Sequence, residues 1–230
     1  VLFTENGQGV GAVPAAYLRG TDGSPAIRLG SGEPLALSPD RQFAAIVDDD
    51  ELQPLSRSRI EIVPTGAGTA RAIPGAGLRY DNARWLPDGA HLLARCREGD
   101  RPPRLYRIDI RDGRHEPVTP EGIGRWALSP DGRKVAAIGA DHLLALYPLD
   151  GGPLRALPEA VDAQWLLAWV DAGLLTLRQG AADVRLGEVS LLDPDSGRHQ
   201  PWTTILPRDA AGIMLMGNFV ATPDGRTLVY

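Results

Sequence analysis

The chain has 230 residues, of which 43% are hydrophobic and 23% are charged, a composition typical of a folded globular protein with a hydrophobic core. Its formal net charge of −5 at pH 7 argues against nucleic acid as a partner. Cys96 is the only cysteine, which excludes an intramolecular disulfide and a cysteine-ligated metal site, and the longest apolar stretches, such as 163–170, are too short to span a membrane.

The first 33 residues read as three strands of an incomplete repeat. One alternating apolar run with a Gly-containing turn is YLRGTDGSPAIRL, which begins at Tyr17. Gly7-Gln8-Gly9-Val10-Gly11 precedes it, and because no helix follows this run, we interpret it as a hairpin loop and not as a phosphate-binding loop. The Pro-Asp-Gly turn of this repeat is expected upstream of Val1, and the chain ends within a strand-like pattern, so we expect it to be a fragment of a longer protein.

A second phrase, built around Pro-Asp, then recurs through the chain. Its copies are LALSPDRQFAAIV from Leu35, ARWLPDGAHLLAR from Ala83, WALSPDGRKVAAI from Trp126, the degenerate LAWVDAGLLTLR from Leu167, and FVATPDGRTLVY from Phe219. The aspartates of these copies are 48, 43, 40 and 53 residues apart. The run that begins at Tyr17 also recurs between these copies, as EIVPTGAGTARAI from Glu61, YRIDIRDGRHEPV from Tyr106, LYPLDGGPLRAL from Leu146 and SLLDPDSGRHQPW from Ser190. Because the two phrases alternate along the whole chain, the sequence indicates a repeat architecture.

The residues of the second phrase have the chemistry of a hairpin turn. Proline sets φ near −65°, aspartate can bond to the local backbone, and glycine takes the left-handed position that closes the turn. We therefore assign a structural role, and no catalytic role, to Ser129 and to the turn residues. These are Pro39, Asp40, Pro87, Asp88, Gly89, Pro130, Asp131, Gly132, Asp171, Gly173, Pro223, Asp224 and Gly225.

One repeat reads as four short strands, which in the second full repeat are expected at 83–86, 91–95, 104–110 and 116–119. The most helix-like segment, 160–170, lies where the first strand of a repeat should be. Four-stranded units with this period and no helices predict an all-β fold, a β-propeller with about five or six blades in this chain.

We expect a single propeller domain over residues 1–230. Its approximate repeats are 1–33 (partial), 34–77, 78–122, 123–160, 161–212 and 213–230 (partial). The two partial repeats could share one composite blade, or each could belong to its own blade of a larger propeller.

The turn phrase followed by an apolar strand, a Tyr and an Asp-containing turn resembles the WD40-like (PD40) repeats of TolB-like propellers. The order of YLRGTDGSPAIRLGSGEPLALSPD, LRYDNARWLPDG, RPPRLY and LALYPLDGGPLRALP is similar to the propeller region of bacterial eukaryotic-like serine/threonine kinases. The chain departs from the repeat at Arg41, where glycine is usual, and at Val170-Asp171-Ala172-Gly173, which lacks the proline.

Other candidate binding residues have structural interpretations that we favour. His91, His115, His142 and His199 are too widely spaced for a local zinc site, and the acidic run Asp48-Asp49-Asp50-Glu51 lacks the spacing of a calcium loop. The arginines around the EGDRPP segment, Arg95, Arg97, Arg101 and Arg104, could meet an acidic partner, but a mixed-charge loop is the simpler interpretation. We expect Trp85, Trp126, Trp165, Trp169 and Trp202 to pack mainly between blades.

From these observations we expect a noncatalytic propeller without a cofactor, which binds a protein or peptide partner at one face. The resemblance implies the propeller portion of a bacterial serine/threonine kinase, in the cytoplasm or outside it depending on what precedes residue 1. Two alternatives remain open: a TolB-like envelope protein that docks other proteins, and the propeller domain of a hydrolase, lyase or serine peptidase. A Gly-x-Ser-x-Gly segment and the kinase signatures are both absent from these 230 residues.

Overall fold

The structure is a computed structural model that describes residues 1–7, 11–48, 58–73, 77–157, 165–179, 187–205 and 220–229. Every regular element in these residues is a β-strand, and all strand pairs are antiparallel. The chain divides into two compact units, 1–121 and 122–230, and each is considered by itself. The division falls at the expected boundary between the repeats 78–122 and 123–160, while the expectation of a single domain stays a prediction.

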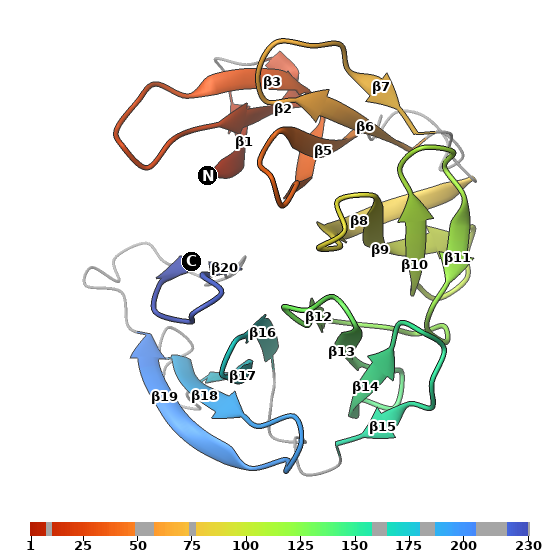
Figure 1. Ribbon diagram of the computed structural model, residues 1–230, viewed down its shortest axis with the longest axis vertical. Helices are drawn as coiled ribbons and strands as arrows, with labels where there is room; N and C mark the ends of the chain where they lie inside the picture. The colour runs from red at the N-terminus through yellow and green to blue at the C-terminus, as the bar shows by residue number, and fades with distance from the viewer. Residues whose placement is uncertain are drawn as a thin grey trace. The chain divides into compact units, whose positions relative to one another are not determined.

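The first unit contains three sheets in chain order (Figure 1). The first sheet has three strands, β1 (Leu2–Gly7), β2 (Gly11–Leu18) and β3 (Ile27–Ser31). The second has four, β4 (Glu33–Leu37), β5 (Phe43–Asp48), β6 (Arg59–Pro64) and β7 (Arg71–Ala72). The third also has four, β8 (Leu78–Trp85), β9 (His91–Glu98), β10 (Arg104–Asp109) and β11 (His115–Pro117).

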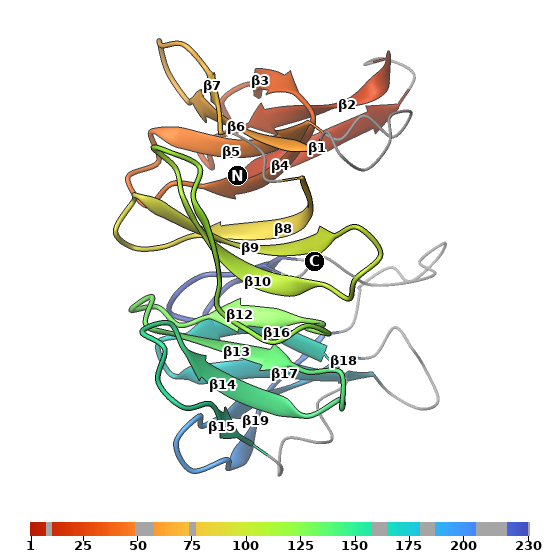
Figure 2. The same cartoon turned by 90° about the vertical axis from the view of Figure 1, so that its right-hand side faces the viewer.

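The second unit repeats this plan (Figure 2). One four-stranded sheet consists of β12 (Trp126–Leu128), β13 (Lys134–Ile138), β14 (Leu144–Pro148) and β15 (Arg155–Ala156). The next consists of β16 (Trp165–Val170), β17 (Gly173–Gln179), β18 (Gly187–Leu192) and β19 (His199–Ile205). A two-stranded sheet, β20 (Val220–Ala221) and β21 (Leu228–Val229), follows.

In each unit the first strands of successive sheets lie next to one another. β4 contacts β1 on one side and β8 on the other, and β16 contacts β12 and β20 in the same way. The facing sides of neighbouring sheets carry the buried aliphatic residues, so the hydrophobic core lies in layers between sheets. Four-stranded sheets of consecutive strands that pack face to face in this way are the blades of a β-propeller.

The largest difference from the expected strand bounds occurs where a β-bulge interrupts side-chain alternation. β8 begins at Leu78 and not at residue 83, and its pairing with β9 shifts between Tyr80 and Asn82. The extra residue puts Tyr80 and Ala83 on the same buried side of the sheet, although they are three positions apart and strict alternation would place them on opposite sides. A strict period of two therefore misses the first half of this strand.

The segment with the most helix-like composition, 160–170, contains β16, and its residues 160–164 lie outside the described residues. No helix in the described part of the chain is long and apolar enough to cross a membrane.

Candidate functional site

Three Pro-Asp turns share one hydrogen-bond scheme at the end of each blade where the first strand joins the second, here named the turn end. In each turn a hydroxyl donates a 2.6 Å bond to Oδ1 of the aspartate two residues later, in the pairs Ser38–Asp40, Ser129–Asp131 and Thr222–Asp224. The same Oδ1 accepts the backbone N–H two residues after the aspartate at 3.0 Å. The hydroxyl oxygen accepts a backbone N–H five residues after its own position. Each turn is thus closed by two side chains and the backbone alone.

These bonds keep the turn aspartates ionised. The hydrogen bond from Ser129, followed by that from the Arg133 amide, lowers the pKa of Asp131. The pKa values of Asp40 and Asp224 are lowered by the equivalent bonds. Because each carboxylate accepts hydrogen bonds from its own turn, its role is to stabilise that turn.

The residue after the turn aspartate has the left-handed conformation. Gly89, Gly132 and Gly225 have φ values of 65°, 69° and 67°, and Arg41 has φ 62° at the equivalent position. A side chain is strained in this region, so Arg41 carries a conformational cost that glycine avoids. In the turn at Asp171, which lacks the proline, Gly173 has φ 143° and the Asp171 amide donates to the Pro223 carbonyl of the next sheet.

The turn at Asp88 uses a histidine where the others use a hydroxyl. Leu86 occupies the position of Ser129 and cannot donate, and His91 Nδ1 lies 2.7 Å from Asp88 Oδ2 instead. Partial burial acts to raise the pKa of Asp88, but bonds from the Ala90 amide and from His91 outweigh it and lower the pKa. His91 is therefore part of the turn structure.

His115 also has a structural role. Its Nδ1 is 2.5 Å from the Gly113 carbonyl, which can only accept, so Nδ1 carries the proton and Nε2 accepts the hydrogen bond of 2.8 Å from the Tyr80 hydroxyl. Burial lowers the pKa of His115, which favours this neutral form. Tyr80 is buried, so this pair joins the outer strand β11 to the core.

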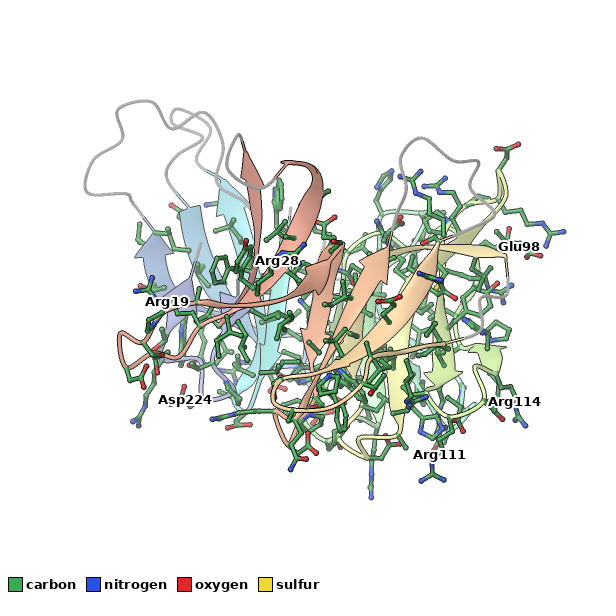
Figure 3. All side chains as sticks on the ribbon, turned by 90° about the horizontal axis from the view of Figure 1, so that it is seen from above. Arg19, Arg28, Glu98, Arg111, Arg114 and Asp224 are labelled. Carbon is green, nitrogen blue, oxygen red and sulfur yellow. The ribbon has the colours of Figure 1, made fainter. Side chains whose placement is uncertain are left out.

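The opposite end of each blade, where the second strand joins the third, is here named the loop end. Figure 3 shows Glu98 at the loop end of the β8–β11 sheet and Arg111 and Arg114 at its turn end. Three of the four arginines that we singled out from the sequence are paired with carboxylates here: Arg95 with Asp81 (3.2 Å), Arg101 with Glu98 and Glu121 (3.4 and 3.8 Å), and Arg104 with Glu121 (4.0 Å). The cluster is a mixed-charge surface, in keeping with the simpler interpretation of this loop.

The tryptophans have different environments. Trp85 is buried and donates its Nε1–H to the Ala36 carbonyl of the neighbouring sheet at 3.3 Å. Trp165 lies under the Arg125 guanidinium, whose carbon is 3.6 Å from the ring centroid, and this contact joins β16 to the residue before β12. Trp169 packs against the core of the β12–β15 and β16–β19 sheets. Trp202 is 39% exposed on the outer strand β19, and its ring faces the next sheet, where a Cβ on Gly225 would lie 3.5 Å from it.

The remaining sequence candidates do not assemble into a site in the described residues. His142 has φ 63° in the β13–β14 connection, and His199 is exposed at the start of β19. Asp48 ends β5, whereas residues 49–51 of the acidic run and 8–10 of the glycine run lie outside the described residues. Within the described ranges, no group of three or more His, Cys, Asp or Glu side chains is arranged to hold a metal ion.

The sequence analysis did not identify one feature, a groove of about 470 Å³ in the second unit. Its lining residues are Trp202, Thr203, Thr204, Ile205, Gly225, Arg226 and Leu228. Trp202 lies at a bulge on β19, where the register shifts between Val189–Thr203 and Ser190–Pro201, and residues 199–204 of this outer strand are all exposed. Nothing in the residue pattern marks this bulge in advance, although the lone Trp on an outer strand was visible.

No protein-family model matches the sequence, and no curated protein matches it. Solved structures do resemble the chain. TolB from Acinetobacter baumannii has a TM-score of 0.65 and 19% sequence identity, over 89% of this chain and 52% of TolB. The chain thus spans about half the length of that protein.

Two enzymes also resemble the chain. Oligogalacturonate lyase in complex with manganese has a TM-score of 0.70 and 16% identity, over 99% of this chain and 66% of the lyase. Puromycin hydrolase has a TM-score of 0.58 and 19% identity, over 93% of this chain and 36% of the hydrolase. At these identities the similarity establishes the fold.

Proposed function

Because the chain has the fold of a TolB-like β-propeller, we propose that it acts as a noncatalytic propeller that binds a protein or peptide partner through its loop end. The observation that carries this proposal is the contrast between the two ends of the blades. At the turn end, three turns repeat one hydrogen-bond scheme. At the loop end, the connections between the second and third strands range from five to ten residues and differ in sequence.

The lengths of these connections range from five to ten residues. β9 and β10 are joined by the five residues 99–103, β13 and β14 by 139–143, β17 and β18 by 180–186, and β5 and β6 by 49–58. A rigid framework with variable loops at one end is the usual way in which a repeat fold acquires a specific binding surface.

The state of the carboxylates supports a noncatalytic role. A general acid or base works best with a pKa near the operating pH, in reach of a substrate. Asp40, Asp131 and Asp224 have lowered pKa values because they accept hydrogen bonds within their own turns, so at neutral pH they have no proton to donate.

The finer assignment rests on the resemblance of the repeats to those of bacterial serine/threonine kinases. In that setting the propeller is a sensor or scaffold attached to the kinase. The similarity to TolB supports the alternative of an envelope protein that docks other proteins. The similarity to puromycin hydrolase, of which this chain covers 36%, supports a propeller domain attached to a peptidase.

Photo-crosslinking from the two ends of one blade tests the proposal. A benzophenone amino acid replaces Asp100 in the β9–β10 loop, and the matched control replaces Asp112 in the β10–β11 turn, in the full-length protein in its native cells. Both aspartates are exposed. We expect one discrete protein adduct from position 100 and none from position 112.

Adducts of equal yield from both positions, or from position 112 alone, would contradict binding at the loop end. Turnover of an added peptide or oligosaccharide substrate by the purified chain would contradict the noncatalytic role.

A further inference from the structure

The outer strands of two sheets each carry an arginine that reaches the next sheet. Arg71 on β7 donates from Nη1 to the Ile110 carbonyl, in the turn between β10 and β11. Arg155 on β15 donates from Nη2 to the Asp195 carbonyl, in the turn between β18 and β19, and its Nη1 lies 3.7 Å from the Asp195 carboxylate. Each contact lies within one unit and joins a sheet to the sheet that follows it in the chain.

The two arginines occupy the same position in their sheets. The residue five positions after the turn aspartate pairs with a third-strand residue, and that residue pairs with the arginine. The two series are Ala45–Ile62–Arg71 and Ala136–Leu146–Arg155. Ile62 and Leu146 belong to the hydrophobic cores between the joined sheets. Because residues that pair across strands share a face, each arginine lies at the outer border of such a core.

The turns that accept these bonds have the same internal structure. In each turn a glycine amide donates at 2.9 Å to the carbonyl of the aspartate four residues earlier, Gly113 to Asp109 and Gly197 to Asp193. Both glycines have φ 73°. The two arginines therefore meet the same kind of turn, although the carbonyls that accept their bonds are one position apart in it.

β7 and β15 have few bonds of their own. Each strand consists of two exposed residues. One backbone bond of 2.8 Å follows each strand, from the Ile73 amide to the Ile60 carbonyl and from the Leu157 amide to the Leu144 carbonyl. A short strand at the edge of a sheet opens locally at little cost in free energy. A guanidinium bonded to the next sheet raises this cost, because opening then also breaks a charge-assisted hydrogen bond.

The longer outer strands of the complete sheets have other residues at this position. In β11, of three residues, the equivalent is Glu116, which bonds to Arg114 of its own sheet. In β19, of seven residues, it is Pro201, which has no side-chain donor. The arginine thus accompanies the two shortest outer strands, where an additional bond matters most.

We propose that Arg71 and Arg155 act as straps, which couple the opening of an outer strand to the turn of the next sheet. With the strap in place, β7 opens together with the β10–β11 turn, and β15 opens together with the β18–β19 turn. The inference concerns the framework of the blades and does not rest on the proposed binding of a partner.

Amide hydrogen exchange of the whole 230-residue chain, followed by NMR at single residues, tests the first strap. The Ile73 amide reports on the outer strand and the Gly113 amide on the turn of the next sheet. Arg71→Met keeps an unbranched apolar side chain and removes the donors. We expect exchange at both amides to become about threefold faster or more, in line with the loss of one hydrogen bond. The Leu157 amide, in the other unit, should exchange at its original rate.

The second strap provides the reciprocal test. Arg155→Met should accelerate exchange at Leu157 and Gly197 and leave Ile73 unchanged. The matched control is Arg178→Met, because Arg178 is also exposed but bonds to Glu188 of its own sheet at 2.7 Å. This control should leave the exchange of all four reporter amides unchanged.

Faster exchange at Ile73 alone in Arg71→Met would overturn the coupling, because the arginine would then support only its own strand. Unchanged exchange at both reporters would show that the bond contributes nothing, and an equal effect of Arg178→Met would show that the response is not specific to the strap. None of these results bears on crosslinking from position 100, so the two proposals fail separately.

Discussion

The Ser129 hydroxyl donates a 2.6 Å hydrogen bond to Oδ1 of Asp131, two residues further along the same turn. Asp131→Ala removes this bond and the one from the Arg133 amide. We expect a loss of about 1–2 kcal/mol in the free energy of unfolding, because the acceptor is charged and serves two donors. Urea denaturation measures the change, with Asp100→Ala as an exposed control that should stay within about 0.5 kcal/mol. An equal loss in both variants would show that the turn bonds contribute nothing specific.

The same bond determines a dependence of stability on acid. Because the hydrogen bonds from Ser129 and Arg133 lower the pKa of Asp131 in the folded state, their contribution is complete above the ordinary value of 3.8. It is lost as the pH falls through the lower, folded pKa. Ser129→Ala should therefore reduce the stability difference between pH 6 and pH 2.5, measured by thermal unfolding. An unchanged difference would mean that the bond does not favour the ionised carboxylate.

His115 should make the fold sensitive to mildly acidic pH. Burial lowers its pKa below the ordinary 6.5, so the unfolded chain binds a proton more readily than the folded chain does. The contribution of neutral His115 is present above pH 6.5 and decreases as the pH falls from there toward the folded pKa. His115→Gln should weaken the loss of stability between pH 7.5 and pH 5.5. His142→Asn, at a residue in a connecting turn, should retain the loss; if it behaves like His115→Gln, the assignment to His115 is wrong.

The turn at Asp40 offers a stabilising change. Arg41 has φ 62°, where glycine stands in three equivalent turns. Arg41→Gly relieves a left-handed side-chain conformation that costs about 1–2 kcal/mol, offset in part by the larger entropy of glycine in the unfolded chain. We expect a net gain of roughly 0.5–1 kcal/mol in urea denaturation. Gly132→Arg, the reverse change in the matched turn, should destabilise; a loss of stability in both variants would contradict the argument.

Trp85 and Trp202 provide a pair of identical residues in opposite environments. Trp85→Phe removes the bond to the Ala36 carbonyl and some buried volume, and we expect a loss of about 1–2 kcal/mol. Trp202→Phe, on an exposed strand, should change the free energy of unfolding by less than about 0.5 kcal/mol. Similar losses would show that Trp202 is part of the core of the second unit.

The repeat was readable from the sequence because its signal is local. Pro, Asp and Gly in fixed order determine a turn within a few residues, and the apolar runs beside them determine the strands. The sequence could not show how His91 replaces a missing hydroxyl at Leu86, since that bond depends on the side-chain directions after the turn.

The bulges at Tyr80–Asn82 and at Trp202 could not be predicted from the sequence either. A bulge adds one residue to one strand of a pair, and only the partner strand reveals it. For that reason the beginning of β8 and the groove beside β19 came from the structure. The proposed binding partner could not be identified from the sequence either, because binding loops vary in sequence and carry no shared motif.

The most direct test of the account is a substitution scan of the loop residues 99–103 and the turn residues 110–114, scored separately for folding and for capture of the partner crosslinked from position 100. The account predicts that changes at the turn end reduce folding, and reduce capture only in proportion. Changes at the loop end should reduce capture while the chain stays folded. If capture follows folding at both ends alike, or is lost specifically at the turn end, the division between a structural end and a binding end is contradicted.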